Sequence, residues 1–442
     1  MLVYKFGGTS VGSVVNMNHV KDIISSDEQK IVVLSAMSGT TNALVDISQL
    51  IEAGDLKTAK ANINALNETY NSVIYDLLQN QKLRKEVSDY VNTRFQLLLQ
   101  SVNQPYSQLL HNNIVANGEL LSTFMFSRLL QQEGFKAQLL PALDFMRIDA
   151  TNEPDNFYIK QNLNRLIEAS ENADIYITQG FICLDAEGQL TNLQRGGSDY
   201  TATIIGAAIE ADEVQIWTDI DGFHNNDPRY VNDTKALSHL SYDEAAELAY
   251  FGAKILHPQT VMPVRSVDIP LRLKNTMAPN AHGTLITNQV HGEGIKAIAA
   301  KDGITAIKIK SVRMLLAHGF LKKVFEVFEK YETSIDMITT SEIAVSLTID
   351  NTTHLEAITE ELEKFATVEI DDYMSIVCLV GHHIIYHPDT PELFQVLQDV
   401  NVRMIAYGGS NNNISLLVNT SDKLETLQKL QRYVFEGEVV GV

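Results

Sequence analysis

Short apolar runs recur along the first half of the chain. Residues 2–4 and 31–34 are runs of this kind, and small residues follow each of them; residues 175–178 and 214–217 have the same character. Buried strands of a parallel sheet have continuous apolar sequences, and helices connect them. The pattern therefore predicts an α/β fold with a mostly parallel sheet.

The segments between and after these runs predict other elements. Residues 43–110 are rich in Leu, Ala, Asn, Gln, Glu and Lys and contain very few glycines and prolines, which predicts two or three helices packed outside the sheet. Residues 282–288 are expected to form the last strand of this part of the chain. Residues 291–294, His-Gly-Glu-Gly, are expected to form a linker.

An internal repeat follows the linker. Residues 325–349 align without gaps on residues 394–418, and the identical pairs begin with Phe325 and Phe394. Each copy has the pattern helix, strand, turn, strand. The repeat predicts two similar small α+β modules. Chance similarity between two amphipathic units is the alternative interpretation.

Composition narrows the classes of function. The chain has 442 residues, enough for two or three domains, and a formal net charge of −21. A strongly acidic protein repels nucleic acid and anionic membranes, so neither is an expected partner. Its two cysteines, Cys183 and Cys378, lack the spacing of metal ligands, and we assign no metal ligands. We expect both cysteines in strands and a cytoplasmic location.

Two glycine-rich turns carry candidate chemistry. In KFGGTS, residues 5–10, paired glycines let backbone N–H groups approach an anion, and Lys5 can reach phosphate oxygens. In RGGSDYTA, residues 195–202, Arg195 suits a planar carboxylate, and Asp199 could hold a metal, an ammonium group or Lys5. The alternative for the first motif is a plain turn, and the alternative for the second is a solvated turn with Ser198 as a helix cap. The sequence contains no P-loop and no G-x-G-x-x-G motif.

Further candidates follow the apolar run 214–217. Asp219 comes directly after it, and Arg229 follows a few positions later. Ligands of α/β sheets bind beyond the carboxyl ends of the strands, so these residues indicate a nucleotide site, with a simple turn former as the alternative for Asp219. Lys254 is a candidate phosphate contact. His257, which precedes a proline, is interpreted as structural.

Together these motifs resemble those of one family. KFGGTSVG, NGELLS, RGGSDYTA, TDIDG with DPR, and FGAKILHP, in this order, are similar to the signatures of aspartate kinases. The terminal repeat resembles the tandem ACT domains of that family. The resemblance covers nearly the whole chain, although residues 43–110 carry little of it.

The resemblance implies a fold and a domain plan. Residues 1–290 would form the amino-acid kinase α/β/α sandwich, residues 296–375 a first ferredoxin-like ACT domain, and residues 376–442 a second. The strand 304–310 is a candidate for exchange into the second ACT domain. A homodimer or homotetramer assembled through the ACT domains is also implied.

The resemblance further implies roles for single residues, carried over position by position. The residues expected at the transferring phosphate are Lys5, Gly7 and Gly8, with Asp199 organising the catalytic cations. The residues expected at the aspartate site are Ser35, Thr41, Glu119, Arg195 and Ser198. The residues expected at the ATP site are Thr218, Asp219, Arg229 and Lys254. His224 departs from the tyrosine that relatives often carry, which leaves its contact open.

The implied activity is transfer of the ATP γ-phosphoryl group, with Mg²⁺, to the β-carboxylate of L-aspartate. The product, 4-phospho-L-aspartate, starts lysine, threonine and methionine biosynthesis. Aspartate has a reference pKa near ~3.9, so its side chain is ionised at neutral pH and needs no general base. Lys5 would neutralise charge on the transferring group.

Lysine is the implied effector, with threonine as the next candidate. The residues expected to bind it in the first ACT module are Met314, Gly319, Phe320, Leu321, Asp336 and Ser341. Two other classes of protein fit the sequence less well. Acetylglutamate and uridylate kinases lack the tandem repeat, and a catalytically inactive sensor would have lost Lys5, Arg195 or Asp199, all of which are present. A fusion to homoserine dehydrogenase is not expected, since the chain stops at Val442.

Overall fold

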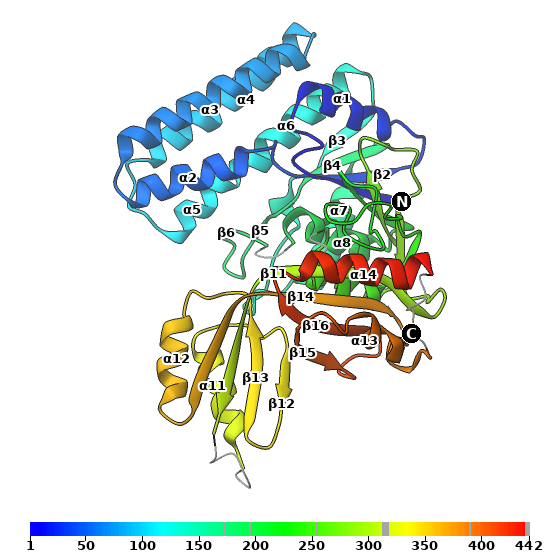
Figure 1. The fold of residues 1–442 in the computed structure, drawn as a ribbon. Helices are drawn as coiled ribbons and strands as arrows, with labels where there is room; N and C mark the ends of the chain where they lie inside the picture. The colour runs from blue at the N-terminus through cyan, green and yellow to red at the C-terminus, as the bar shows by residue number, and fades with distance from the viewer. Residues whose placement is uncertain (171–172, 194–195, 253–254, 312–317, 389, 438–442) are drawn as a thin grey trace. The chain divides into compact units, whose positions relative to one another are not determined.

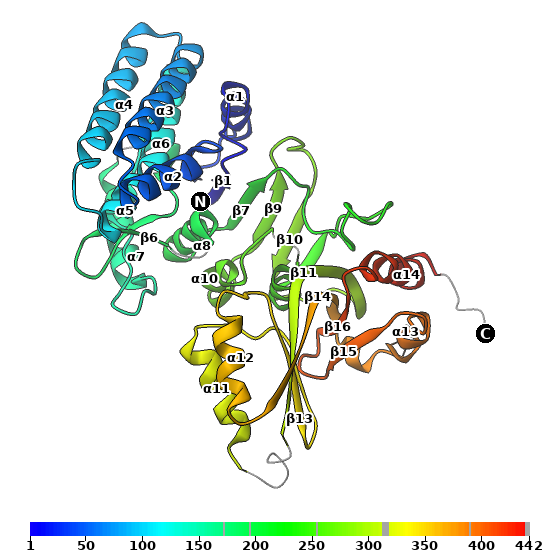
Figure 2. The same ribbon diagram turned by 60° about the vertical axis from the view of Figure 1, so that its left-hand side comes forward.

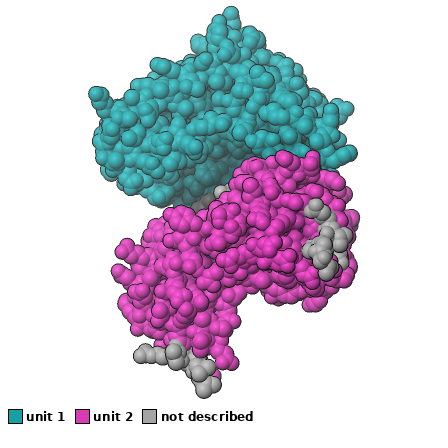
Figure 3. Space-filling model, viewed as in Figure 1, with its two compact units in different colours: residues 1–222, 256–288 teal, residues 223–255, 289–442 magenta. Residues whose placement is uncertain are grey.

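The computed structural model of the chain consists of two compact units (Figure 3). Unit 1 contains residues 1–222 and 256–288, and unit 2 contains residues 223–255 and 289–442. The sequence did not indicate that residues 223–255 belong with the C-terminal part. The structure describes residues 1–170, 173–193, 196–252, 255–311, 318–388 and 390–437.

Unit 1 is built on a mostly parallel sheet, as predicted. Its strand order is β3-β4-β2-β1-β7-β9-β10, and neighbouring strands are parallel except β9 and β10, which are antiparallel. The strands are β1 (Leu2–Phe6), β2 (Lys30–Leu34), β3 (Ala137–Leu139), β4 (Ile175–Gln179), β7 (Glu213–Thr218), β9 (Leu271–Asn275) and β10 (Thr284–Thr287).

Both faces of this sheet are buried, which explains the continuous apolar runs. Tyr4, Phe6 and Val32 belong to a core cluster that they share with helices, whereas Val3 and Val33, at alternate positions, are buried outside that cluster. The helices of unit 1 are α1 (Val14–Ile23), α2 (Thr40–Glu52), α3 (Leu56–Leu77), α4 (Gln81–Ser101), α5 (Gln108–Val115), α6 (Asn117–Gln132), α7 (Asn156–Ala169), α8 (Gly197–Ile209) and α10 (Met262–Ser266).

The helices predicted within residues 43–110 are confirmed. The long helices α3 and α4 lie side by side at one end of unit 1 (Figures 1 and 2). Asp55 and Asn80 start them, because each side chain accepts hydrogen bonds from the free N–H groups of its first turn. Unit 1 also contains the short helices η1 (Ala142–Asp144) and η2 (Pro258–Val261) and a hairpin of β5 (Ile182–Leu184) and β6 (Leu190–Asn192).

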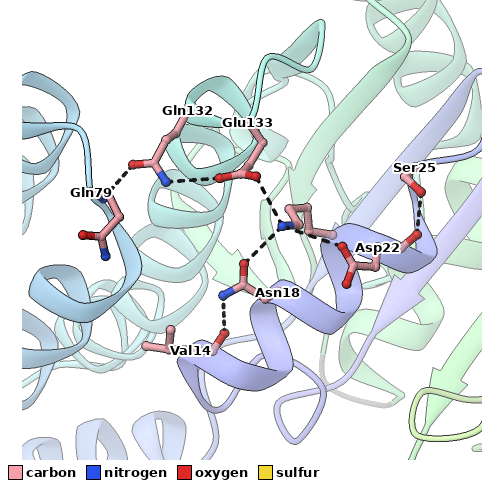
Figure 4. A network of polar contacts seen from close by, with 8 residues as sticks. Val14, Asn18, Asp22, Ser25, Gln79, Gln132 and Glu133 are labelled. Carbon is pink, nitrogen blue, oxygen red and sulfur yellow. Dashed lines mark hydrogen bonds and ion pairs between the residues drawn. The ribbon is translucent and has the colours of Figure 1, made fainter.

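A surface network joins the first helix to this helical layer (Figure 4). Lys21 donates to Asn18 on its own helix α1 and to Glu133, which follows α6. Gln132 donates to Glu133 and accepts from the backbone of Gln79, in the connection between α3 and α4. Most of these contacts are exposed and the Lys21–Asn18 bond is partly buried, so we assign the network an orienting role and little stability.

Unit 2 contains a six-stranded sheet in the order β12-β13-β11-β14-β16-β15, whose strands are labelled in Figure 1. The predicted repeat is confirmed, because α11, β12 and β13 recur as α13, β15 and β16. The elements of unit 2 are β8 (His239–Ser241), α9 (Tyr242–Tyr250), β11 (Gly294–Lys310), α11 (Phe320–Lys330), β12 (Ile338–Thr340), β13 (Ala344–Ile349), α12 (Leu355–Glu363), β14 (Thr367–His382), η4 (Ile384–Tyr386), α13 (Thr390–Val396), β15 (Val402–Tyr407), β16 (Asn413–Asn419) and α14 (Lys423–Glu436).

Two long strands run through both modules of this sheet. β11 pairs with β14 along its length, and residues 305–310 of β11 pair with β13 on the other side. Ile307 and Ile309 lie in the core of the first module, whereas Ile298 lies in the core of the second. The suggestion that residues 304–310 complete the second module is therefore wrong: the earlier half of β11 does so.

Both cysteines lie in strands, as expected. Cys183 is buried in β5 and Cys378 in β14, and both are free thiols. Burial raises the pKa of Cys183 to about 12, so this thiol stays protonated and unreactive at neutral pH. Among the helices that the structure describes, none is long and apolar enough to cross a membrane.

Candidate active site

The two glycine-rich turns predicted to carry chemistry meet in unit 1. Lys5 lies near the end of β1, and its ammonium group is 2.6 Å from Asp199 Oδ1, in the first turn of α8. Lys5 is 9% exposed, so this charge pair is largely shielded from water. A shielded pair keeps stronger electrostatic interactions than a solvated one, and Asp199 therefore fixes the position of the lysine.

The Gly7–Gly8 turn fits closely against a neighbouring loop. A β-carbon on Gly8 would lie 3.0 Å from the carbonyl oxygen of Ala36, and Gly8 O accepts a hydrogen bond of 3.1 Å from Ser38 N. A β-carbon on Gly7 would lie 3.4 Å from the Lys5 ammonium. Small residues here leave backbone N–H groups accessible beside a cation, which is the chemistry of a phosphate site.

The second turn opens helix α8. Gly196 and Gly197 have φ angles of 71° and 47°, in the left-handed region that side chains disfavour. A β-carbon on Gly180, which follows β4, would lie 2.3 Å from Ser198 Oγ. Ser198 and Asp199 are consequently held at the N-terminus of a 13-residue helix, where the helix dipole favours negative charge.

The structure brings several residues of the predicted acceptor site together. Ser35 Oγ donates to Ser198 Oγ over 2.9 Å, and Ser122 Oγ donates to the carbonyl of Ser35 over 2.8 Å. Thr41 lies in the first turn of α2, one position after the buried Thr40. Arg195, the cation expected to bind a carboxylate, lies outside the described residues.

Glu119 lies against the Ala36 loop, and its carboxyl group has a strongly raised pKa. It is 3% exposed, and its Oε1 accepts a hydrogen bond of 3.2 Å from Ala36 N. Burial raises the pKa of Glu119 to about 7, although the hydrogen bonds from backbone N–H groups oppose the shift. Within the described part of the chain, Glu119 Oε2 has no hydrogen-bond partner. A buried, unsatisfied carboxylate oxygen is suited to receive an ammonium group.

The predicted nucleotide residues divide between the two units. Thr218 ends β7 in unit 1, and its hydroxyl donates to Asp219 Oδ1 over 3.1 Å. Arg229 lies in unit 2, where it is exposed and pairs with Asp227 over 2.6 Å. His224, also in unit 2, lies 2.9 Å from the hydroxyl of Thr234. Lys254 lies outside the described residues.

Residues expected to bind an effector are found around the start of α11. Gly319 is the N-cap of this helix, with a φ of 85°, and Leu321 is exposed. Phe320 packs in the core of the first module, where its ring contacts that of Phe365 edge-on. An effector contact of Phe320 would therefore come from its backbone. Met314 lies outside the described residues.

Asp336 already has internal partners. Its Oδ1 accepts hydrogen bonds from Lys301 Nζ at 2.7 Å and from the hydroxyl of Tyr250 at 2.9 Å, and Lys301 also pairs with Asp350 at 2.9 Å. Asp336 Oδ2 is buried with no hydrogen-bond partner among the described residues. Ser341 is exposed, and its hydroxyl oxygen accepts from Ala344 N at 3.2 Å. Asp336 thus binds an ammonium group of this chain, and its contact with an effector stays a prediction.

Three residues that pack beside the predicted acceptor residues were not predicted from the sequence. Gly180 packs on Ser198, and Phe181, with a φ of 69°, donates through its backbone N–H to Thr201 Oγ1 over 2.9 Å. Ser122 was not identified as a partner of Ser35. The available signal was Gly180, two positions after the apolar run 175–178, since Gly7 likewise follows the run 2–4 by a few positions.

Comparison with known proteins supports this geometry. The sequence model of the amino acid kinase family matches residues 1–275, and an ACT domain model matches residues 377–433. The lysine-sensitive aspartokinase 3 of Escherichia coli (strain K12) is 34% identical over 450 residues, which cover 99% of each chain. Aspartokinase 2, chloroplastic, of Arabidopsis thaliana is 34% identical over 465 residues, which cover 99% of this chain and 84% of the relative.

Solved structures agree. One match is the crystal structure of E. coli aspartokinase III in complex with aspartate and ADP, described as the R-state. Its TM-score is 0.84 and its identity 33%, and the match covers 98% of this chain and 100% of that chain. The same enzyme with lysine and aspartate, described as the T-state, matches with a TM-score of 0.82, 34% identity, and 98% and 99% coverage.

The mostly parallel sheet, the paired glycine turns and the matched family model define the class: the chain belongs to the amino acid kinase family. Within that family, its full-length relatives place it among the aspartokinases.

Proposed function

We propose that the chain phosphorylates the side-chain carboxylate of L-aspartate at the expense of ATP, giving 4-phospho-L-aspartate and ADP. The observation that carries this proposal is the arrangement of two opposite charges in unit 1. Lys5 lies beside the Gly7–Gly8 turn. The buried Glu119 accepts a hydrogen bond from Ala36, in the loop against which that turn packs, and its Oε2 has no partner among the described residues. The site thus offers a cation for the phosphates of the nucleotide and a carboxyl group for the ammonium group of aspartate.

The acceptor end of the reaction needs orientation and no base. The ionised β-carboxylate oxygen of aspartate attacks the γ-phosphorus, and the bond from that phosphorus to the bridging oxygen of ADP breaks. Glu119 Oε2 would receive the α-ammonium group of aspartate, and Arg195, carried over by resemblance, its α-carboxylate. Ser35 and Ser198 offer hydroxyls beside this position.

The donor end requires stabilisation of negative charge. Lys5 would hold the transferring phosphoryl group together with the backbone N–H groups of the glycine turn. Mg²⁺ would supply further positive charge at the phosphates when bound. Within the described residues, no cluster of three His, Cys, Asp or Glu could hold a metal ion. This fits an ion that is held mainly by substrate phosphates and one or two carboxylates, such as Asp199.

The direct test is an assay of the purified chain with ATP, Mg²⁺ and each of aspartate, glutamate and acetylglutamate. We expect ADP release that depends on aspartate, together with an acyl phosphate that hydroxylamine traps. ADP release that is equal with all three acceptors, or without any, would contradict the assignment.

We further propose that lysine inhibits the enzyme from the first ACT module, near Gly319, Asp336 and Ser341. The tandem modules and the similarity to an enzyme named lysine-sensitive support this. We also propose a homodimer or homotetramer. β12 and β15 are the end strands of the six-stranded sheet, and pairing between copies would cover such edges.

A further inference from the structure

A hydrogen bond between two buried hydroxyl groups joins residues 5–10, which we call the phosphate turn, to the end of strand β9. Ser10 follows the paired glycines, and Thr276 follows β9; their side-chain oxygens are 2.8 Å apart. Ser10 is 1% exposed and Thr276 0%. Water therefore cannot compete for this hydrogen bond, and breaking it would leave a polar group buried without a partner.

Thr276 is also hydrogen-bonded to Thr218, which with Asp219 forms the segment predicted to bind the nucleotide, called the nucleotide segment below. Its backbone N–H donates to the carbonyl of Thr218 over 2.8 Å, at the point where β7 ends. Asn275, the preceding residue, lies opposite Thr218 in the parallel pairing of β7 with β9. One residue thus connects the turn that contains Ser10 with the segment that contains Thr218 and Asp219.

The phosphate turn has a separate anchor toward the acceptor residues. Gly8 O accepts from Ser38 N at 3.1 Å, and the same loop donates from Ala36 N to Glu119 Oε1. This contact is independent of Thr276. The turn therefore has one anchor shared with Glu119 and another shared with Thr218, and loss of the second should leave the first intact.

We propose that Thr276 is a positioning residue for phosphoryl transfer, whose hydroxyl holds Ser10, and with it the Gly7–Gly8 turn, in register with the nucleotide segment at Thr218. The inference rests on the proposed kinase function. Thr276 acts through Ser10 and through its own backbone, so it needs no contact with either substrate.

The test removes the hydroxyl at nearly constant shape. Thr276→Val should raise the KM for ATP and the Kd for ADP by about tenfold, because small displacements of positioning groups have effects of this size or larger. The KM for aspartate should stay within about twofold, since the contacts of Glu119 are unchanged. Thr276→Ser keeps the hydroxyl and should restore ADP binding.

A matched control and a double-mutant cycle separate this role from general packing. Thr178 in β4 is another buried threonine of the same sheet, and its hydroxyl has no hydrogen-bond partner in the described part of the chain. Thr178→Val should leave ADP binding unchanged. Ser10→Ala should mimic Thr276→Val, and the double variant should be no weaker than either single one, since all three lack the same bond.

Two results would overturn the inference: normal ADP binding by a folded Thr276→Val, or additive effects of the two single substitutions. If Thr276→Val does not fold, Ser10→Ala breaks the same bond, and normal ADP binding by that variant would overturn it equally. Calorimetry with ADP needs no phosphoryl acceptor. Failure of the wild type to phosphorylate aspartate would therefore contradict the proposed function alone.

Discussion

Glu119 has the property expected of a residue that meets a positive charge only when substrate is present. Its carboxyl group is buried, one oxygen has no hydrogen-bond partner among the described residues, and its pKa is raised to about 7. In the free protein, roughly a tenth of this group is ionised at pH 6 and roughly nine tenths at pH 8.

The raised pKa predicts that the affinity for aspartate increases with pH. Only the ionised Glu119 attracts the α-ammonium group, so the KM for aspartate should fall by about tenfold from pH 6 to pH 8. In Glu119→Gln, which has no charge to titrate, the KM should be high and nearly independent of pH. The same pH dependence in that variant would assign the titration to another group.

Removing the Lys5 ammonium group should lower turnover and have little effect on the fold. Lys5→Ala should lower kcat by about 10²–10³-fold, because one charged partner of the transition state is lost. The Asp199 side chain is 19% exposed, so water reaches part of it in the variant. Lys21→Ala, in the surface network of α1, is the matched control and should retain full turnover. A Lys5→Ala enzyme with more than half of wild-type turnover would exclude this role.

Among the single elements, α9 is connected to the six-stranded sheet within unit 2 by side chains along its length. Glu244 pairs with Lys296 on β11 at 2.6 Å, Glu247 accepts from Asn413 on β16, and Tyr250 donates to Asp336. Gly252, just beyond the helix, has a φ of 128°, and a β-carbon there would lie 1.9 Å from the carbonyl oxygen of Ala300.

Tyr250→Phe tests one of these connections. Burial and the nearby Asp336 raise the pKa of Tyr250, which therefore acts as a neutral donor at all ordinary pH values. Removing the hydroxyl should destabilise unit 2 by about 1 kcal/mol in denaturant unfolding, the usual net contribution of such a bond. Tyr373→Phe, at an exposed side chain, should change nothing. Equal stability of both variants would show that the bond adds no net stability.

Elements that are buried on both faces were predictable from the sequence, whereas contacts made by tertiary structure were not. The runs 2–4, 31–34 and 175–178 became β1, β2 and β4 because each strand is covered on both sides. The left-handed backbone of Phe181 depends on Thr201, which is distant in sequence, and no local pattern indicates such a conformation. The same holds for the Ser10–Thr276 pair.

At the scale of the whole molecule, residues within motifs could be predicted from the sequence, whereas contacts between distant segments could not. Lys5, Ser35, Glu119, Ser198 and Asp199 were proposed as site residues from motifs, and the fold brings them to neighbouring strand and helix ends of unit 1. The partners of Asp336 could not be predicted, because Lys301 and Tyr250 come from other segments. The membership of residues 223–255 in unit 2 likewise follows from packing and not from local sequence.

Lysine sensitivity is a prediction about the molecule as a whole. If lysine binds an inactive state preferentially, a coupling of about 1–3 kcal/mol would weaken substrate binding by roughly 5–150-fold. Linkage is reciprocal, so aspartate with a non-hydrolysable ATP analogue should weaken lysine binding by the same factor, measured by calorimetry. Asp336→Asn and Ser341→Ala should relieve inhibition and leave uninhibited turnover nearly unchanged. Lys301 keeps Asp350 as a partner in the first variant.

Two outcomes would remove lysine from this site: no lysine binding by the wild type, or unaltered inhibition in both variants. Threonine would then be tested by the same titrations. Sedimentation at equilibrium, with and without lysine, would establish whether the chain is a dimer or a tetramer in each state.

The shared strands β11 and β14 also determine when the regulatory sheet can form during synthesis. The first half of β11 is synthesised before its partner strand β14, and β14 pairs in turn with β16, which ends at residue 419. Until β14 and β16 are synthesised, the apolar side chain of Ile298 lacks the core residues that cover it in the folded chain. Long-range pairing of this kind is slow and prone to aggregation. Nascent chains that stall before residue 419 should therefore be captured by chaperones more strongly than chains released after it.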